Sequence, residues 1–434
     1  MIKALPFMLV ATSVMATPPA SAEPPAPLTW TSCGATGASP NPVATRTACA
    51  SLVVPRDYDD PAAGTLVLDV VRVIADAQRG ARHDGTLLLE PDEFAEEAGI
   101  AVPTMASAWL HGADAWRDVS QRLDLVGLAQ RRMDDAGGND CLSATSRLPR
   151  HVALGIDVSP ANMVTAEGLA RAIAAACQND PMHAHIGAQA RIRDMETLRE
   201  ALGESRLHLL GVGRGGWVAA RYAERYPENV GRMLLDSSWD IDGSVVEAME
   251  ARVEERGRAL RRGGADGVVS ADRHGDPYGF GSHAAGKSPA QLASVFATRC
   301  NDGYWGTRQR YWRERTHELR EAWPSSVGNE TFQGMVCSVW PGAWGGSRVP
   351  NLNAAPSFLM AHAEFDNEAP LRHAVMGLHG HSKARMVVAR GLHAHGISVL
   401  FDRPCVAAVT GRFLADGVLP DAKLTNCALP GATP

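Results

Sequence analysis

Residues 209–217 form the stretch whose side chains could do chemistry, because a short apolar run meets a glycine-rich turn there. Gly211 and Gly215 have the spacing of the GxSxG nucleophile elbow, a sharp strand-to-helix turn that exposes a serine at the helix N-terminus. Gly213 stands at the position of that serine. Glycine has no side chain that could carry an acyl group, so the sequence excludes covalent catalysis from residue 213.

The same turn also matches a second motif, the GxGxxG fingerprint of dinucleotide-binding folds. Its glycines would be Gly211, Gly213 and Gly216. Asp236 follows about 20 residues later, where that fold places a carboxylate on the ribose. Taken locally, the motif predicts a dinucleotide-binding oxidoreductase, which the rest of the chain reduces to a remote alternative.

Two later segments could supply an acid and a base. Asp366 follows an apolar run and precedes Pro370, and His395 follows the run at 385–388, with His393 as a close alternative. A nucleophile position, then an acid, then a histidine is the chain order of α/β-hydrolase triads. The pair could be structural, or it could act as a general base on water or on a substrate proton.

Several other histidines could be imagined as metal ligands. They are His373, His379 and His381, together with His393 and His395. A His-x-His pair is a weak signal without a third fixed ligand. We therefore predict solvated or hydrogen-bonded histidines, with no metal site and no cofactor.

The elements that must position these residues are short apolar runs that alternate with helical stretches. The predicted strands lie at 65–74, 85–89, 123–127, 207–210, 233–235, 357–360 and 385–388. This alternation predicts a mainly parallel sheet with helices on both faces. The strand signal stops between about 240 and 328, so we predict a helical lid at 240–345, inserted between core segments 23–239 and 346–434.

The N-terminus predicts export. Lys3 precedes the apolar run 4–16, and the small residues 20–22 complete the pattern of a signal peptide at 1–22. No later run approaches the length that spans a bilayer, so the protein is not expected to be membrane-embedded. A net charge of -6 over 434 residues, without a basic tract, gives no reason to expect nucleic acid as a partner. The destination would be periplasmic or extracellular.

The eight cysteines agree with export. None of them forms a CxxC pair, which argues against a zinc site and favours disulfide bonds in an oxidising compartment. Sequence alone leaves the connectivity open. We predict that neighbours along the chain pair: Cys33 with Cys49, Cys141 with Cys177, Cys300 with Cys337, and Cys405 with Cys427.

The order of several phrases along the mature chain resembles the tripeptidyl-aminopeptidase-like α/β hydrolases of peptidase family S33. These phrases lie at 29–33, 49–58, 193–203, 221–227, 231–236, 300–302, 337–341 and 405–427. The resemblance covers nearly all of the mature length. It implies an α/β-hydrolase fold with a lid, Asp366 as the triad acid and His395 as the base.

The chain departs from that family at three places. Gly213 replaces the serine, residues 90–94 replace a Gly-Gly-Pro-Gly oxyanion loop, and residues 129–136 lack a glycine-rich turn. Asp92 and Glu93 would bring negative charge near an oxyanion, which opposes catalysis. We therefore predict a pseudo-hydrolase whose pocket binds a peptide or small molecule. The alternative is a divergent hydrolase or a lyase/isomerase-like enzyme that uses His395 and Asp366 without a serine.

Overall fold

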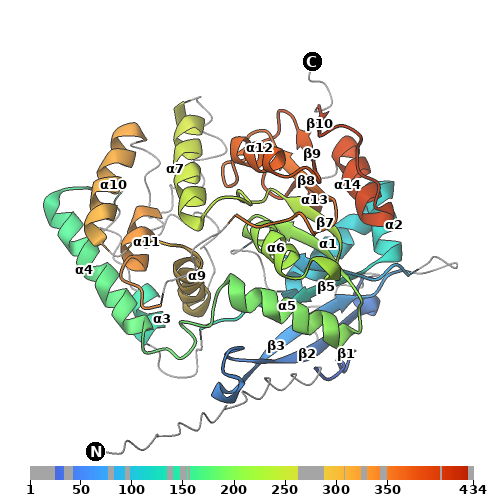
Figure 1. Ribbon diagram of the computed structural model, residues 1–434, viewed down its shortest axis with the longest axis horizontal. Helices are drawn as coiled ribbons and strands as arrows, with labels where there is room; N and C mark the ends of the chain where they lie inside the picture. The colour runs from blue at the N-terminus through green and yellow to red at the C-terminus, as the bar shows by residue number, and fades with distance from the viewer. Residues whose placement is uncertain are drawn as a thin grey trace, which may run out of the picture.

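A computed structural model describes most of the mature chain. The described residues are 25–33, 43–76, 83–92, 98–133, 140–146, 154, 157–261, 288–306, 308–323, 330–342, 349–400 and 403–428. The predicted signal peptide lies outside them, as do residues 93 and 94 of the segment 90–94. In Figure 1 the sheet and its flanking helices occupy one side of the molecule, and a group of helices occupies the other.

One sheet runs through the described core, in the order β1-β2-β3-β5-β4-β6-β7-β8-β9-β10. Its strands are β1 Thr31–Ser32, β2 Thr47–Pro55, β3 Thr65–Val73, β4 Thr86–Glu90, β5 Asp124–Leu128, β6 Leu207–Val212, β7 Val230–Asp236, β8 Phe358–Ala363, β9 Ala384–Ala389 and β10 Leu424–Cys427. All pairings from β5 to β10 are parallel, and β1, β2 and β3 join by antiparallel pairing. The parallel strands read as continuous apolar runs because helices cover both of their faces.

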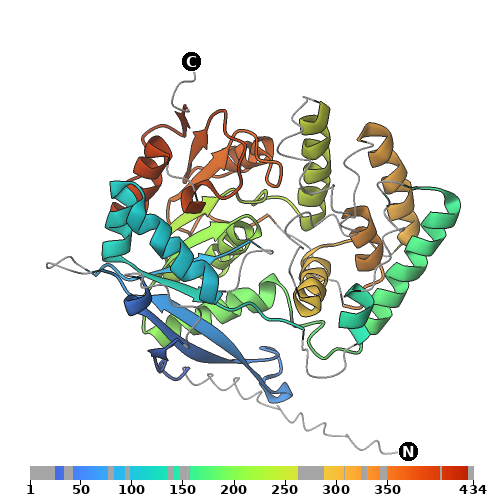
Figure 2. The ribbon, with the colours of Figure 1, turned by 180° about the vertical axis from the view of Figure 1, so that it is seen from behind.

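Two helical layers cover the sheet. One face carries α5 Ala188–Leu202, α6 Arg214–Arg225 and α12 Leu371–Gly380. The other carries α1 Ala98–His111, α2 Asp114–Arg122, the short α13 Ile397–Leu400 and α14 Pro404–Asp416. Figure 2 shows α1 and α2 in cyan and α14 in red on this second face. The predicted α/β-hydrolase architecture, a mainly parallel sheet with helices on both faces, is confirmed.

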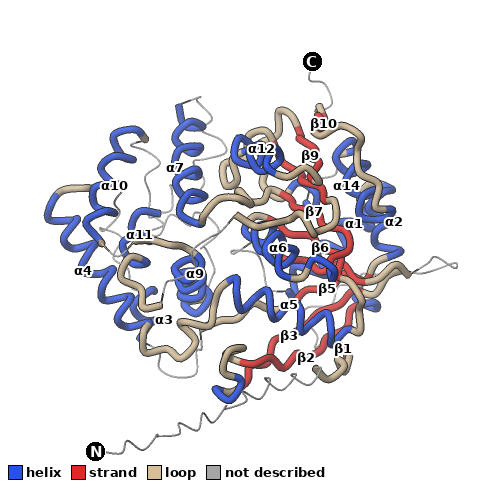
Figure 3. The backbone as a smooth tube through the Cα atoms, in the orientation of Figure 1, coloured by secondary structure: helices blue, strands red, loops and turns tan. Residues whose placement is uncertain are grey.

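The regular elements described between β7 and β8 are all helices, as the loss of strand signal predicted. They are α7 Val245–Arg261, α9 Pro289–Asp302, α10 Gln309–Ala322 and α11 Glu330–Cys337. Two earlier helices, α3 Asp140–Ser146 and α4 Pro160–Cys177, pack against α9 and α11. Figure 3 shows this group as helices and loops beside the strands. The sequence did not predict that α3 and α4 join the group, and the boundaries at 240 and 345 stay a prediction.

The predicted strands agree with the observed ones to within a few residues. The sequence missed β2, whose exposed and buried residues alternate, and the short strands β1 and β10. Three short 3-10 turns complete the described elements: η1 Ala44–Arg46, η2 Pro61–Ala63 and η4 Pro227–Asn229. None of the described helices combines the length and the apolar character needed to cross a membrane.

Four disulfides bind the elements together, and the predicted pairing of neighbours is confirmed. Cys33–Cys49 links the segment after β1 to β2, and Cys405–Cys427 links α14 to β10. Cys141–Cys177 joins α3 to α4, and Cys300–Cys337 joins α9 to α11. The last two bonds each staple a pair of helices within the helical group, where no sheet hydrogen bonds help to hold the chain.

Candidate functional site

The carboxyl ends of the parallel strands bring the predicted site residues together. Asp92 lies just beyond β4, Gly213 just beyond β6, Asp366 beyond β8 and His395 beyond β9. In open parallel sheets, ligands bind outside this edge because the loops of neighbouring strands converge there. The described residues of the site therefore come from four loops that are far apart in sequence.

The turn after β6 has the shape of a nucleophile elbow. Gly213 has φ 55° and ψ -122°, and α6 begins at Arg214 directly after it. A Cβ on Gly211 would lie 2.6 Å from the backbone of the α6 start, and one on Gly215 would lie 2.0 Å from the carbonyl oxygen of Glu90. The flanking glycines are thus required by close backbone approach, whereas Gly213 leaves room where a side chain would stand.

The carboxylate of Asp92 fills that room. A Cβ built on Gly213 would lie 2.4 Å from Cγ of Asp92 and within 2.7 Å of both carboxylate oxygens. The backbone N–H of Arg214 donates to Oδ1 of Asp92 at 2.9 Å. In a serine hydrolase the N–H after the nucleophile belongs to the oxyanion hole. Here a carboxylate of the protein itself occupies that donor, at the positive end of the α6 dipole.

Asp366 and His395 form the contact that the sequence predicted. Nδ1 of His395 lies 2.9 Å from Oδ2 of Asp366. Oδ1 of the buried Asp366 accepts the N–H groups of Glu368 and Ala369 at 2.8 and 3.0 Å, which orients the carboxylate. His393 is exposed and stacks on Phe365, with ring centroids 4.5 Å apart. The acid is therefore paired with His395 and not with His393.

His395 lies between two carboxylates. Its Nε2 is 3.4 Å from Oδ2 of Asp92, while Nδ1 faces Asp366. Burial opposes the charge, but the two carboxylates outweigh it and raise the pKa of His395 well above 6.5. Burial would likewise raise the pKa of Asp92, yet His395 and the Arg214 N–H lower it to about 2. The raised pKa of His395 favours an imidazolium beside the carboxylates, and about a quarter of the Asp92 side chain is exposed.

Asp236, the carboxylate of the dinucleotide motif, supports the histidine loop. It is fully buried at the end of β7. Its oxygens accept the N–H groups of Ile397 and Ser398 at 3.0 and 2.6 Å. These bonds cap α13 directly after His395 and Gly396, so Asp236 holds the backbone that carries the imidazole.

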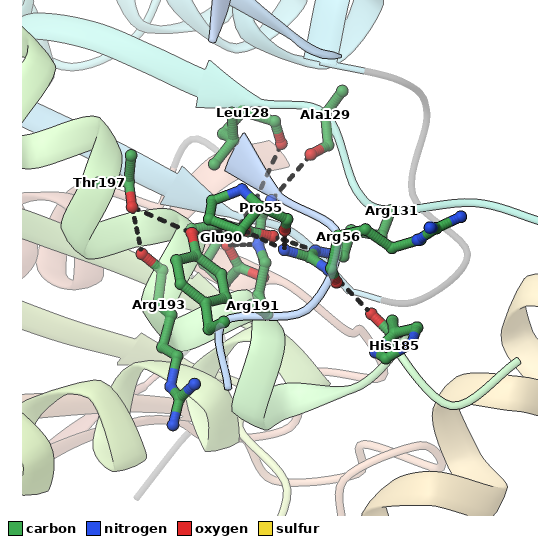
Figure 4. Close-up of polar contacts among 12 residues, drawn as sticks. Pro55, Arg56, Glu90, Leu128, Ala129, Arg131, His185, Arg191, Arg193 and Thr197 are labelled. Atoms are coloured by element: carbon green, nitrogen blue, oxygen red, sulfur yellow. Dashed lines mark hydrogen bonds and ion pairs between the residues drawn. The ribbon is translucent and has the colours of Figure 1, made fainter. Parts of the chain in front are cut away.

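A buried ion pair holds the start of the Asp92 loop. Glu90 is inaccessible to solvent, and Arg191 on α5 donates to its carboxylate at 2.8 to 3.0 Å. The same guanidinium donates to the carbonyl oxygens of Leu128 and Ala129 at 2.9 Å. Figure 4 shows these groups converging at the ends of β4 and β5. Arg191 therefore links the end of β4, two residues before Asp92, to the end of β5.

The helices beside the sheet are also tied to the site. Arg214 forms a buried ion pair with Asp302 at the end of α9. On the acid side, Arg252 and Arg256 of α7 contact Glu368 at 3.1 and 2.7 Å. Both halves of the site are thus connected to the helical group by charged contacts that sequence reasoning missed, because partners so far apart leave no local signal.

A cavity of about 750 Å³ lies next to the Asp92 loop. Its described lining includes Leu52, Val71 and Leu89 of the sheet, Pro91, and Leu292 and Val295 of α9. Asp92, Gly213 and His395 are not among the described lining residues. The cavity therefore reaches the residue next to Asp92 through Pro91, and its lining includes residues of both the sheet and α9.

Of the other predicted histidines, His379 is exposed, and His373 and His381 each lie near one carboxylate. His373 lies 3.8 Å from Asp240, and His381 lies 2.7 Å from Asp242. Within the described residues, no three His, Cys, Asp or Glu side chains are grouped so that they could hold a metal ion.

Comparison with known proteins gives the family. The α/β-hydrolase fold family matches residues 182–375, and the TAP-like protein family matches residues 324–427. Tripeptidyl aminopeptidase of Streptomyces lividans is 24% identical over 93% of this chain and 87% of that protein. Carboxylesterase B of Mycobacterium tuberculosis is 32% identical over 50% of this chain and 41% of that protein.

Among solved structures, the chain is similar to proline iminopeptidase of Mycobacterium smegmatis. The identity is 16%, the match covers 84% of this chain and 97% of that chain, and the TM-score is 0.39. The two family matches overlap in sequence and together include the elbow, Asp366 and His395. This protein therefore belongs to the α/β-hydrolase fold family, in the branch with a TAP-like C-terminal region.

Proposed function

We propose that this protein binds a peptide or small molecule between the sheet and the lid helices, and does not cleave it through an acyl-enzyme at residue 213. The observation that carries the proposal is the Asp92 carboxylate, which fills both the space of a serine side chain and the Arg214 N–H. A substrate carbonyl could not enter an oxyanion hole that already holds a negative charge.

The adjacent cavity supports a binding role. Its volume of about 750 Å³ is within the usual range of small-molecule sites. Its described lining is largely apolar, with Leu52, Leu89 and Leu292 among the contributors. A ligand held there would contact residues of both the sheet and α9.

A divergent enzyme is the second candidate, either a hydrolase or a lyase/isomerase-like catalyst that uses His395 as a general base. The 2.9 Å contact between His395 and Asp366 favours it, since that contact fixes the imidazole. The ion pair with Asp92 opposes it, because the raised pKa of His395 favours the protonated form, which cannot accept a proton. His395 could act as a general base only after the negative charge of Asp92 had been removed.

The dinucleotide-binding oxidoreductase is the remote alternative. Both Asp236 oxygens already accept protein N–H groups. Asp236 is therefore not available for a ribose hydroxyl. A nucleotide-dependent rise in melting temperature would revive this alternative.

Labelling with a fluorophosphonate tests the proposed function. The wild type is expected to remain unlabelled and to leave tripeptide and ester chromogenic substrates intact. Gly213→Ser combined with Asp92→Gly restores a hydroxyl and frees the Arg214 N–H, so labelling at residue 213 is expected there. The matched control combines Gly213→Ser with Asp421→Gly at an exposed site. A wild-type label on any serine would contradict the proposal.

We propose further that the protein is exported to the periplasm or the medium. The four disulfides fit an oxidising compartment. N-terminal sequencing of the exported protein is expected to begin at Glu23. Recovery of a chain that still begins at Met1 from the culture medium or the periplasm would contradict the predicted cleavage.

A further inference from the structure

The cavity has a polar wall that the candidate site does not use. On β3, Asp69 and Val71 are two residues apart, so their side chains lie on the same face of the sheet. Val71 is buried there beneath α1, whereas Asp69 is exposed. Both residues line the cavity, and neither Gly213 nor His395 is among its described lining residues. The cavity therefore contains a carboxylate that is separate from the remnants of the triad.

The carboxylate of Asp69 has no partner within the described part of the chain. The backbone N–H of Ala129 donates to the carbonyl oxygen of Asp69 at 2.8 Å, and this bond leaves the side chain untouched. Ser51 lies opposite Asp69 on β2 and also lines the cavity, and its exposed hydroxyl has no described partner either. Residues directly opposite in an antiparallel pair share a face, so the hydroxyl and the carboxylate lie side by side.

The other charges in the described lining are already engaged. Arg131 forms a buried ion pair with Asp194 through two hydrogen bonds of 2.8 Å. The same guanidinium donates to backbone carbonyl oxygens at the end of β2. Arg132 is not free either. Among the described lining residues, Asp69 is therefore the one charge without a partner, and that charge is negative.

The remaining walls can accommodate an apolar body. They carry Leu89 of β4, Pro91, Val102 of α1, and Leu292 and Val295 of α9. Such walls favour alkyl or aromatic groups, because contact with them removes apolar surface from water. A volume of about 750 Å³ is far more than a single ion needs and suits an organic molecule.

We propose that this cavity binds an organic amine, in which one ammonium group is attached to an alkyl or aromatic body. The ammonium lies against Asp69 and Ser51, and the body lies against the apolar walls. An ammonium offers three N–H donors, and both a carboxylate and a hydroxyl can accept them. The inference rests on the proposed binding function, and it names the chemical class of the ligand.

The charge of Asp69 makes the cavity selective among ligands with the same body. An alcohol keeps the apolar contacts but lacks the charge, and a carboxylate is repelled by Asp69. Partial exposure limits the benefit to the amine, because water and salt screen the ion pair. We therefore expect the amine to bind about fivefold more tightly than the alcohol at low ionic strength.

A matched series of ligands tests this order of affinity. The compounds n-octylamine, n-octanol and n-octanoate differ in their head group, and at neutral pH they are cationic, uncharged and anionic. Isothermal titration calorimetry of the full chain should give the order amine, alcohol, carboxylate. Added salt should weaken the binding of the amine much more than that of the alcohol. Equal affinities for amine and alcohol would overturn the inference.

Substitutions at residue 69 test where the ammonium lies. Asp69→Asn should remove the preference for the amine over the alcohol, and Asp69→Lys should make the carboxylate the tightest ligand. Both variants should melt like wild type, because Asp69 is exposed and its carboxylate has no described partner. Asp421→Lys reverses an exposed charge outside the described lining, so it should leave the order unchanged. An amine preference that survives both substitutions at residue 69 would contradict the proposed contact.

A glycine of α1 offers a way to fill the cavity. Gly99 lines it, and a Cβ built there meets no heavy atom within 4 Å apart from its own helix backbone. Gly99→Trp should therefore abolish the binding of all three ligands without straining the fold. Gly168 of α4 has equally open surroundings and is outside the described lining, so Gly168→Trp is the matched control. Unchanged binding in Gly99→Trp would show that the ligands lie elsewhere and would overturn the inference.

The outcomes separate this inference from the proposed function. If the three ligands bind equally well and Gly99→Trp blocks them all, the cavity binds small molecules without selecting an amine, and only the inference is wrong. A fluorophosphonate-labelled serine would instead overturn the proposed function, and a measured preference for the amine would still stand.

Discussion

The two halves of the site differ in how far they keep the geometry of their family. On the side of β8 and β9, Asp366 and His395 make the contact that the resemblance implied. On the side of β4 and β6, a glycine stands for the serine, and Asp92 occupies the oxyanion donor. The described residues of both halves have buried partners. The comparison teaches that the nucleophile side places a carboxylate where the resemblance implied a serine and a glycine-rich loop.

The strongest test of the rebuilt half removes its buried support. Glu90→Gln leaves the guanidinium of Arg191 buried without its anion, so the free energy of unfolding should fall by about 3–5 kcal/mol. Urea denaturation measures this loss. Glu314→Gln removes the exposed partner of Arg310 and is expected to leave the midpoint unchanged. Equal effects of the two substitutions would show that the Glu90 pair does not hold the loop.

The corresponding test of the retained half is Asp366→Asn. The amide loses the charge that faces His395 and offers a weaker acceptor to the N–H groups of Glu368 and Ala369, so a loss of about 1.5–3 kcal/mol is expected. NMR titration should show a marked fall in the pKa of His395. An unchanged pKa would mean that Asp366 does not control the imidazole.

A double-mutant cycle tests whether a side chain at residue 213 and the carboxylate of Asp92 compete for the same space. Gly213→Ser in the wild-type background forces a side chain against the Asp92 carboxylate, with an expected cost of about 1–3 kcal/mol. In the Asp92→Gly background the same substitution should cost less, because the space is empty. Chemical denaturation of the four proteins gives the coupling. Additive effects of the two substitutions on the free energy of unfolding would contradict the predicted clash between the two side chains.

The smallest effect is expected from Asp92→Asn. The amide oxygen can still accept the Arg214 N–H, so only the partly exposed charge contact is lost, and stability should fall by about 0.5–1.5 kcal/mol. The pKa of His395 should fall less than in Asp366→Asn, since Asp92 is farther away and more exposed. A larger fall than in Asp366→Asn would mean that Asp92 raises the pKa of His395 more than Asp366 does.

The pH dependence of stability follows from His395 and its two carboxylate neighbours. Because the folded pKa of His395 lies above 6.5, its stabilisation is present in full below about pH 6.5 and disappears as the pH rises through the folded value. The groups that act on His395 are Asp366 and Asp92, with Glu368, Asp236 and His362 nearby. Asp92→Asn should move this loss to lower pH, as melting curves across the alkaline range can show.

Local sequence was sufficient for much of the fold. Apolar runs predicted the strands that carry the site because burial on both faces demands continuous apolar residues. The spacing of Gly211, Gly213 and Gly215 predicted the elbow, since close backbone approach leaves no room for a Cβ at the flanking positions. The cysteines of neighbouring elements paired as predicted.

Other features were decided by contacts between distant segments. Sequence left His393 and His395 both open as the base, and the stacking of His393 on Phe365 leaves only His395 facing the acid. The joining of α3 and α4 to the later helices depends on tertiary packing, which no local pattern records.

The sequence by itself determined that residue 213 cannot be a nucleophile, because the absence of a side chain is a property of glycine alone. It also determined that Asp92 brings a negative charge to this loop. Only the tertiary structure decided where that charge lies. The strand order, the pair of Glu90 with Arg191 and the α6 N-terminus together place the carboxylate where the serine would be, and hydrogen bonds between distant residues stabilise it there.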